Sequence, residues 1–435
     1  MLRVLAASAV VVLLAGCSSG ASTTSSSTAG TSGSAAASAG PSSAPSSAPS
    51  SAAPAGGLTI VSQGLKKDGA QVILDASQAD STVVASVLSQ TNADDYDAGL
   101  AVSTDGGGTW RWGGFVPDKG KTFPEGVVAT ADGAVMVGST EVTSGSSVTS
   151  KAFLAVASAP DFAPQPLSPK EFDGDNIHLQ DVAIISGNWI VVGWQQAAPD
   201  ATGLAPRTSF LWRSSDKGAT WTKTKLEVPD SIDNSVEQIV YGPDGSWNIV
   251  GQAVFGDGAN QYDPIWLKST DAGNTFSLTN KDAFTAPLDQ GATRIEFAGD
   301  GSAGVLGWDE VTDGNAARAS ALWASGADEK LQRIGTTSVP VSGGTPPGEF
   351  IDGILWDNTT LAAWGSPTGS YPMQNVQFWG LTKDGLTQST MLPGNGTPLA
   401  ISRIIVGKTD TLAFGFTGKD LASADAAVWK GTSVQ

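Results

Sequence analysis

Residues 103–110 read Ser-Thr-Asp-Gly-Gly-Gly-Thr-Trp, and the same pattern returns twice further along the chain. Residues 214–221 read Ser-Ser-Asp-Lys-Gly-Ala-Thr-Trp, and residues 269–276 read Ser-Thr-Asp-Ala-Gly-Asn-Thr-Phe. Each copy follows a short apolar run, and weaker copies place aspartates at 161, 328 and 384. The six aspartates are separated by 56, 55, 55, 57 and 56 residues. Such regular spacing indicates a structural repeat of about 55 residues.

Each repeat also contains two apolar runs that are separated by a tight turn, as in residues 182–185 and 189–194. With one strand on either side of the aspartate turn, a repeat holds four strands, which is the size of one propeller blade. Repeats start near residues 70, 124, 180, 237, 293, 351 and 402. The sequence therefore predicts an all-β, seven-bladed β-propeller of four-stranded blades, with six or eight blades as the alternatives. The last repeat ends after three strands, so we expect residues 58–62 to supply its fourth strand and close the ring.

The pattern S-x-D-x-G-x-T-aromatic resembles the Asp-box, or BNR repeat, of sialidases and other β-propellers. The resemblance covers residues 58–435. It implies that Asp105, Asp216 and Asp271 stabilise the turns between third and fourth strands, on the face opposite to the ligand-binding face. It does not imply one activity, because propellers carry many unrelated functions.

The residues needed for sialidase catalysis are not evident. That family clamps a substrate carboxylate with three arginines and has an Arg-Ile-Pro motif near its first blade, which this sequence lacks. His178 is the only histidine, so no histidine-rich metal site is possible. No glycine-rich nucleotide motif follows a strand. We therefore expect no catalytic residues, no metal and no cofactor, with a glycoside hydrolase distantly similar to sialidases as the alternative.

The repeat alignment gives one set of ligand-binding candidates. Arg294, Arg403 and Asp181 occupy equivalent positions at the start of innermost strands, next to several other acidic residues. Because innermost strands converge on the channel of a propeller, we expect these side chains at its mouth. The two arginines either bind an anionic group there or neutralise the neighbouring acids.

The connections between second and third strands give the other candidates, which are Trp194, Arg207, Tyr262, Asp263, Trp308 and Tyr371. Exposed aromatic rings beside carboxylates suit sugar or peptide recognition. Packing between blades is the alternative for Trp194 and Trp308. We interpret residues 92–97, which contain three aspartates and Tyr96, as a solvated loop rather than a calcium site.

The N-terminal residues resemble a bacterial lipoprotein signal. Arg3 precedes an apolar run over residues 4–14, and residues 14–17 read Leu-Ala-Gly-Cys, like a lipobox. The resemblance implies a signal peptide at residues 1–16 and a lipid on Cys17, the only cysteine. Residues 18–57 contain only Ser, Ala, Gly, Thr and Pro, which predicts a disordered tether up to the folded domain at 58–435.

The formal net charge of −18 disfavours phosphate backbones as partners, so we do not expect nucleic acid. We expect an extracytoplasmic, non-catalytic propeller that is anchored to the bacterial cell membrane through its lipid only. Its expected partner is an envelope or extracellular protein, peptide or glycan.

Overall fold

The computed structural model describes residues 59–92, 95–116, 121–145, 147–200, 203–256, 261–284, 289–312, 315–326, 328, 330–334, 350–356, 361–366, 375–393, 399–407, 410–419 and 421–432. All of them belong to one unit of the chain, Pro54–Gln435. The predicted signal peptide, Cys17, the tether and Tyr371 lie outside the described residues.

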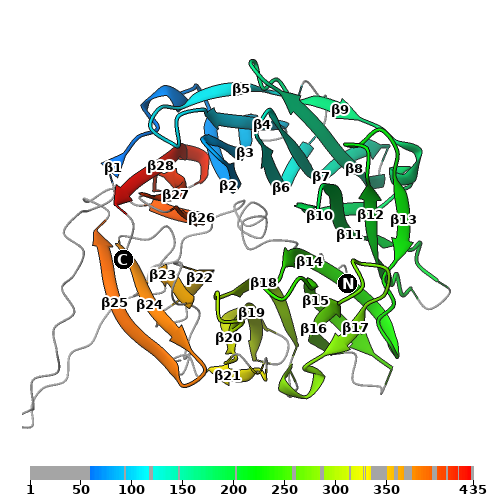
Figure 1. Ribbon diagram of the computed structural model, residues 1–435. Coiled ribbons are helices and arrows are strands. Elements are labelled where there is room, and N and C mark those ends of the chain that lie inside the picture. Colours follow the sequence, from blue (N-terminus) through cyan, green and yellow to red (C-terminus); the bar gives the residue numbers. More distant parts are fainter. Residues whose placement is uncertain are drawn as a thin grey trace, which may run out of the picture. The chain divides into compact units, whose positions relative to one another are not determined.

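The unit is nearly all-β, and consecutive strands lie side by side in antiparallel sheets (Figure 1). One large sheet contains β2 (Ala70–Ala79), β3 (Thr82–Asn92), β4 (Asp95–Ser103), β5 (Arg111–Phe115), β6 (Lys121–Thr130), β7 (Gly133–Ser144), β8 (Ser147–Ser158) and β9 (Gln165–Leu167). Among the described residues, a single parallel pair, Tyr96 with Lys121, joins β2–β5 to β6–β9. Each half of the large sheet therefore repeats a four-stranded pattern.

The remaining sheets have four strands each. The first contains β10 (Ile177–Ile185), β11 (Asn188–Gln196), β12 (Arg207–Ser214) and β13 (Thr222–Lys225). The second contains β14 (Ser231–Tyr241), β15 (Trp247–Phe255), β16 (Tyr262–Ser269) and β17 (Ser277–Thr279). The third contains β18 (Gln290–Phe297), β19 (Ala303–Thr312), β20 (Asn315–Ala324) and β21 (Gln332–Ile334). Another contains β22 (Phe350–Trp356), β23 (Leu361–Ser366), β24 (Asn375–Thr382) and β25 (Gly385–Pro393). Short 3-10 helices lie at η2 (Gln63–Leu65), η3 (Lys170–Phe172), η4 (Lys281–Phe284) and η5 (Leu421–Ser423).

The last sheet joins the two ends of the described chain. It contains β26 (Leu399–Val406), β27 (Asp410–Thr417), β28 (Asp425–Thr432) and, at its outer edge, β1 (Thr59–Ile60). Thr59 pairs with Lys430 and Ile60 with Trp429. The first strand therefore completes the sheet that the last three strands begin.

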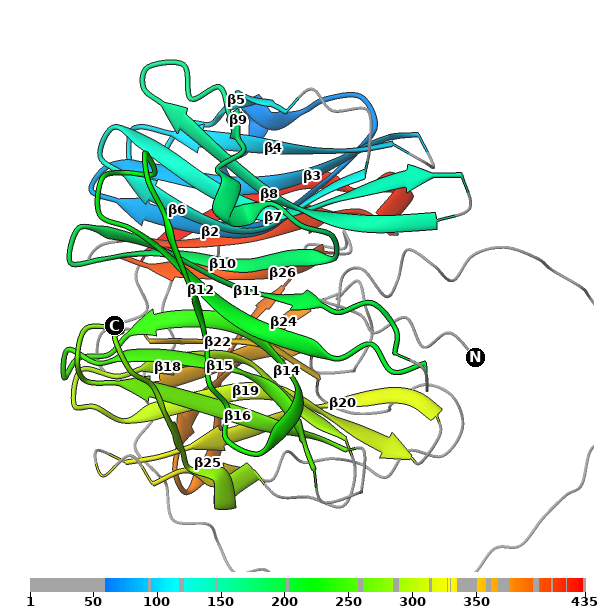
Figure 2. The same ribbon diagram turned by 90° about the vertical axis from the view of Figure 1, so that its right-hand side faces the viewer.

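Apolar clusters fill the spaces between successive sheets, which lie face to face (Figure 2). One cluster joins Ile190 and Leu211 of one sheet to Ile249 and Ile265 of the next. All nine residues of β15 are buried, because this strand has a neighbouring sheet on each face. Third strands carry a buried tryptophan at one repeated position, namely Trp212, Trp323, Trp379 and Trp429, whereas Trp266 is shifted by one residue. The core is thus a series of similar layers.

Every innermost strand contains a β-bulge near its start. The shifts of register fall at Ile73/Asp75, Pro124/Gly126, Leu179/Asp181, Val236/Gln238, Ala292/Arg294, Ile351/Gly353 and Ile401/Arg403. The residue after each bulge is therefore structurally equivalent in all of these strands. This agrees with the sequence alignment of Arg294, Arg403 and Asp181, and it adds Asp75 to the set.

The two ends of the sheets differ. The aspartate-containing turns lie beside the turns between first and second strands: Gly106 N–H donates to the carbonyl of Ser81, and Lys268 pairs with Asp244 at 3.0 Å. We call this the turn end. The opposite end carries the connections between second and third strands and those between sheets, and we call it the rim.

One predicted loop is wrong. Residues 92–97 form no long acidic loop, because β3 ends at Asn92 and β4 begins at Asp95. Tyr96 is buried and packs on Phe123 with the ring centroids 5.5 Å apart. Strand pairing therefore extends almost to the tip of this hairpin.

Candidate functional site

The three strong aspartate turns are built alike. Oδ1 of Asp105 accepts the N–H groups of Gly108 and Thr109, both at 2.9 Å, and the hydroxyl of Ser103 at 2.7 Å. Oδ2 accepts the hydroxyl of Thr109 at 2.7 Å. Asp216 and Asp271 make the corresponding bonds with Thr220 and Thr275. These carboxylates are committed to their own turns at the turn end.

The hydrogen bonds also set the acidity of these groups. Led by the bond from the Thr109 backbone N–H, they lower the pKa of Asp105 to about 2. The hydroxyl of Thr220 leads the same shift for Asp216, and the hydroxyl of Thr275 leads it for Asp271. The weaker copies differ: Asp384 lies in the two-residue turn between Thr382 and Gly385 and pairs with Lys383.

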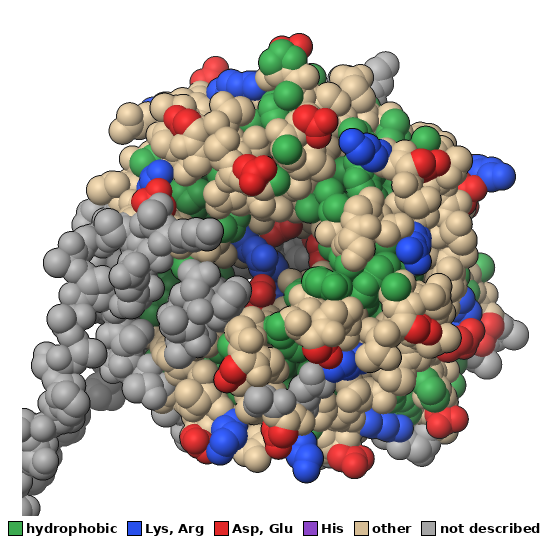
Figure 3. Space-filling view, in the orientation of Figure 1, with side chains coloured by type: hydrophobic (Ala, Val, Ile, Leu, Met, Phe, Trp, Pro, Cys, Tyr) green, Lys and Arg blue, Asp and Glu red, His purple; other side chains and the backbone are tan. Residues whose placement is uncertain are grey.

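A cluster of charged side chains lies where innermost strands of different sheets meet, around a hollow at the centre of the view (Figure 3). It contains Asp75 of β2, Asp181 of β10, Arg294 and Glu296 of β18, and Arg403 of β26. We call these five residues the channel cluster. The structure thus brings together three predicted residues, Arg294, Arg403 and Asp181.

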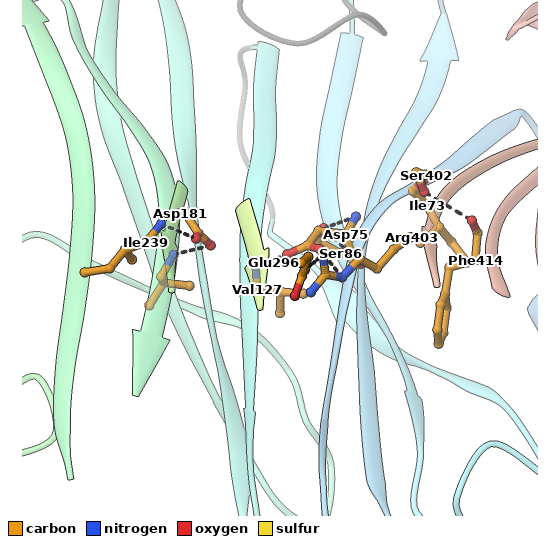
Figure 4. A network of polar contacts seen from close by, with 11 residues as sticks. Ile73, Asp75, Ser86, Val127, Asp181, Ile239, Glu296, Ser402, Arg403 and Phe414 are labelled. Carbon is orange, nitrogen blue, oxygen red and sulfur yellow. Dashed lines mark hydrogen bonds and ion pairs between the residues drawn. The ribbon is translucent and has the colours of Figure 1, made fainter. Parts of the chain in front are cut away.

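Asp75 and Asp181 are held by backbone groups of neighbouring sheets (Figure 4). Oδ2 of Asp75 accepts the N–H of Val127 at 3.0 Å. Oδ2 of Asp181 accepts the N–H of Ile239 at 2.9 Å. Oδ1 of Asp181 accepts the N–H of the next residue, Val182, at 2.7 Å. Both oxygens of Asp181 therefore already have partners.

The two arginines of the cluster are in different states. Arg403 lies 3.4 Å from Glu296 Oε1 and 3.8 Å from Asp75 Oδ1, so its charge is neutralised within the cluster. Its Nε is nevertheless buried without a hydrogen-bond acceptor. Arg294 makes no hydrogen bond or ion pair with any residue that the structure describes, although Asp75, Asp181, Glu296 and Arg403 all act on it electrostatically.

Burial shifts the pKa values of this cluster. Loss of solvent, followed by repulsion from Asp75, raises the pKa of Asp181 to about 7. Burial also raises the pKa of Glu296 and lowers that of Arg294. Burial opposes charge on Arg403 as well, but the carboxylates of Glu296, Asp75 and Asp181 outweigh it and raise its pKa. Asp181 therefore loses its negative charge as the pH falls below 7.

A second group of predicted residues meets at the rim, across two sheets. His178 of β10 stacks on Trp194 of β11, with ring centroids 4.0 Å apart and a 17° angle between the planes. The guanidinium of Arg207 lies 5.6 Å from the Trp194 ring and 4.9 Å from the Tyr262 ring of β16. We call these four residues the rim stack. Among the predicted candidates, the structure brings Trp194, Arg207 and Tyr262 together.

Two expectations about the rim stack are wrong. Arg207 is not on a loop but begins β12, and it is 5% exposed because it pairs with Asp233 of the next sheet, Nη2 to Oδ1 at 2.8 Å. Trp194 is not an exposed ring, since it is buried between His178 and Arg207. Packing between sheets, the alternative for Trp194, therefore describes its setting. Tyr262 and His178 keep part of their surface.

The remaining candidates are scattered. Trp308 of β19 packs over Gly291, where a Cβ would lie 2.5 Å from its Nε1. Asp263 is half-buried in β16, next to Tyr262. Four members of these groups were not predicted from the sequence, namely Asp75, Glu296, His178 and Asp233. Asp75 has the same position after the bulge as Asp181, so an alignment of the first repeat with the third would identify it. Nothing in the local sequence marks Asp233 as the partner of Arg207.

The described part of the chain was also compared with the needs of a metal site and of a membrane span, and it meets neither. No three His, Cys, Asp or Glu side chains come together there in a group that could hold a metal ion. Within the same ranges, no helix has the length and apolar character needed to cross a bilayer.

No known family model matches the sequence, and no curated protein matches it either. Among solved structures, polysaccharide lyase Uly1 superposes with a TM-score of 0.56 at 10% identity, over 83% of this chain and 89% of that one. YCF48 bound to a D1 peptide gives 0.49 at 12% identity, over 87% and 97%. Trypanosoma rangeli sialidase in complex with sialic acid gives 0.44 at 10% identity, over 88% and 59%. At this level of identity the likeness concerns the fold alone, a β-propeller of antiparallel sheets.

Proposed function

We propose that this chain is a lipid-anchored, extracytoplasmic β-propeller that binds an anionic group of a peptide, protein or glycan and catalyses no reaction. The observation that carries the proposal is Arg294. Its guanidinium has five N–H donors and, among the described residues, no acceptor. A guanidinium with free donors in a recess suits a carboxylate, which it can bind through two parallel hydrogen bonds.

The state of the carboxylates supports binding rather than catalysis. Both oxygens of Asp181 and one oxygen of Asp75 accept backbone N–H groups, so these side chains serve the scaffold. The N–H donors of Ile239 and Val182 lower the pKa of Asp181 and so favour the carboxylate over the protonated form that a general acid needs. Burial raises the pKa of Tyr262, which disfavours the phenolate that a tyrosine nucleophile needs.

The proposal includes a ring of seven blades. Each innermost strand contacts the innermost strand of the next sheet in the order β2, β6, β10, β14, β18, β22, β26, and β26 contacts β2 again. The pairing of β1 with β28 supports closure by the N-terminal strand. In such a ring the channel cluster lies near the axis, and Asp105, Asp216 and Asp271 are structural Asp-box residues on the far face.

The anchoring part of the proposal rests on the sequence. A signal peptide at residues 1–16, a lipid on Cys17 and a Ser/Ala/Pro-rich tether would hold the propeller outside the bacterial cell membrane. We expect radiolabelled palmitate to label the chain and Cys17→Ser to abolish the label. A Cys17→Ser chain that is still labelled and still sediments with membranes would contradict the anchor.

The binding proposal is tested with the full chain in detergent. The probes are a panel of glycans with and without uronic acids, and N-acetylated peptides with free or amidated C termini. We expect binders only among carboxylate-bearing probes, and a loss of roughly tenfold or more in affinity for Arg294→Gln. Arg213→Gln is the matched control, because Arg213 lies at the turn end against Asn188 and Ala272. Equal binding of neutral probes, or unchanged binding by Arg294→Gln, would sink the proposal.

One observation favours the alternative, a glycoside hydrolase distantly similar to sialidases. The pKa of Asp181 is raised to about 7, and carboxyl groups that act as general acids typically have a pKa raised in this way. A panel of methylumbelliferyl glycosides tests this directly. Turnover by the wild-type chain that Asp181→Asn removes, with the fold intact, would establish catalysis in place of simple binding.

A further inference from the structure

The rim stack is preorganised by contacts from both sheets. Asp233 holds Arg207 through Nε at 2.9 Å and Nη2 at 2.8 Å, and also accepts the backbone N–H of Arg207 at 3.3 Å. The N–H of Tyr262 donates to Asp289 at 3.0 Å. The aromatic and guanidinium planes are therefore fixed before any partner arrives. Rigid aromatic and arginine side chains of this kind are enriched at the energetic centres of protein interfaces.

Two exposed aliphatic side chains lie close in sequence to the members of the buried ion pair between Arg207 and Asp233. Leu204, three residues before Arg207, is 60% exposed, and Ile232, directly before Asp233, is 55% exposed. Among the described residues only Ile60, Val142, Val148 and Tyr241 are large, apolar and comparably exposed. Because Arg207 N–H reaches Asp233, the segments that carry Leu204 and Ile232 adjoin at the rim.

Two hydrogen bonds to Asp200 hold the backbone of Leu204. The N–H of Leu204 donates to Asp200 Oδ1 at 3.0 Å, and the N–H of Asp200 donates to the carbonyl of Leu204 at 2.8 Å. Ala197 N–H closes the base of the loop on the carbonyl of Pro206. An apolar side chain held outward on a closed loop loses little entropy when a partner covers it.

The surrounding charge selects the partner. Asp200, Glu227 and Asp230 are exposed on the same connections. Two cations lie nearby: Lys225 is 3.2 Å from Glu227, and Lys281 is 4.1 Å from the ring of Phe255, which pairs with Ser231. The whole chain carries a net charge of −18. A partner that covers Leu204 and Ile232 must meet these carboxylates, so complementarity calls for positive charge beside its apolar contact.

We propose that the rim around Leu204, Ile232 and the rim stack docks a protein segment in which an apolar side chain is flanked by Lys or Arg. This surface is separate from the channel cluster and goes beyond anion binding at Arg294. It uses the partly exposed ring of Tyr262 and the two aliphatic side chains as its apolar floor.

The test selects a random displayed peptide library on the full chain and then measures one selected peptide by fluorescence anisotropy. We expect the selected peptides to carry Leu, Ile, Phe or Trp next to Lys or Arg. Leu204→Asp and Ile232→Asp should each weaken binding roughly tenfold. Val148→Asp is the matched control, because Val148 is 58% exposed on another sheet. The same peptide with an amidated C terminus and an acetylated N terminus should bind equally well, which separates this proposal from carboxylate binding at the channel site.

Several outcomes would overturn the docking proposal. Selected peptides that are acidic, or that bind Leu204→Asp and Ile232→Asp as tightly as wild type, contradict it. Analytical ultracentrifugation that shows self-association of the wild-type chain, lost in Leu204→Asp, would make the occupant a second copy of this chain. Binding of neutral glycans that is lost in Ile232→Asp would make it a sugar-binding surface instead.

Discussion

The carboxylate of Asp181 on β10 accepts the backbone N–H of Ile239 on β14 at 2.9 Å. Asp75 does the same for Val127 at 3.0 Å, and Gln238 for Ile295 at 2.7 Å. In each case the acceptor follows a bulge in one innermost strand, and the donor lies one residue beyond the corresponding position in the next innermost strand. Bulges interrupt strand pairing, and these side chains satisfy backbone groups that would otherwise be unpaired. The repeated bulge therefore links neighbouring sheets as well as shaping each strand.

Gln238 is the best residue at which to measure how much this hydrogen bond contributes to stability, because its side chain is buried and uncharged. We expect Gln238→Leu to lower the free energy of unfolding by about 1–3 kcal/mol, since the N–H of Ile295 loses its acceptor in a buried site. Chemical denaturation gives the value. Gln78→Leu, an exposed change on β2, is the control and should stay within about 0.5 kcal/mol of wild type. Equal losses for the two variants would refute the link.

Gly126 departs from the pattern for a steric reason. A Cβ at this position would lie 2.9 Å from the Cα of Asp181 on the next sheet, so only glycine fits. In the repeated pattern, a side chain at position 126 would accept the N–H of Val182. Because glycine has no side chain, that N–H donates instead to Oδ1 of Asp181 at 2.7 Å. Asp181 therefore satisfies two backbone donors and makes up for the missing side chain.

His178 makes the rim stack sensitive to acid. Burial, followed by repulsion from Arg207, lowers its pKa from 6.5 to about 4. Because the unfolded chain binds this proton more readily, stability should fall as pH drops from 6.5 to 4, by about 3 kcal/mol in total. His178→Phe keeps an aromatic partner for Trp194 and should flatten this part of the curve. As the only histidine, His178 also gives one set of imidazole NMR signals, and a titration midpoint near 6.5 would contradict the buried setting.

The turn aspartates should matter in a lower pH range. Asp271 accepts four hydrogen bonds within its turn, and its pKa is lowered to about 2, chiefly by the Thr275 hydroxyl. Its stabilising effect should be complete above pH 4 and lost as pH falls towards 2. Asp271→Ala should therefore lower the melting temperature at pH 7 and change little at pH 2. Asp161→Ala is the matched control, since Asp161 follows the third strand of its own set but makes no side-chain hydrogen bond among the described residues. A similar loss at pH 7 in both variants would contradict this account.

The sequence predicts the sheets well because each repeat carries its own local signals. Apolar runs and glycine turns recur along the chain, and the aspartate pattern is complete in three units, so these good copies help to interpret the weaker ones. Asp75 escaped the alignment because it lies 30 residues before Asp105, whereas Asp181 lies 35 before Asp216. The difference arises in the connection from the second to the third strand, which is short after Asn92 and long after Gln196.

The setting of Arg207 could not be predicted, because its partners are remote in sequence. Asp233 lies 26 residues away on another sheet, and Tyr262 lies further still. Local sequence shows only an arginine after a polar, proline-containing connection, which favours exposure. Burial of that charge is possible only because two sheets bring a carboxylate and two aromatic rings to one point. The identity of the site thus depends on how sheets meet, which the repeat alone does not encode.

A last test concerns the pairing of the N-terminal strand β1 with the last strand β28. Val61 N–H donates to the carbonyl of Val428 at 2.8 Å, directly after Thr59 and Ile60 pair with β28. Proline at position 61 removes this donor, so Val61→Pro should lower the melting temperature by several degrees more than Val61→Ala, which loses only packing. Hydrogen exchange at β28 should speed up in the proline variant, because its outer edge loses a partner. If the two variants melt together, β1 contributes no pairing to the stability of the last sheet, and the chain must hold its two ends together by other means.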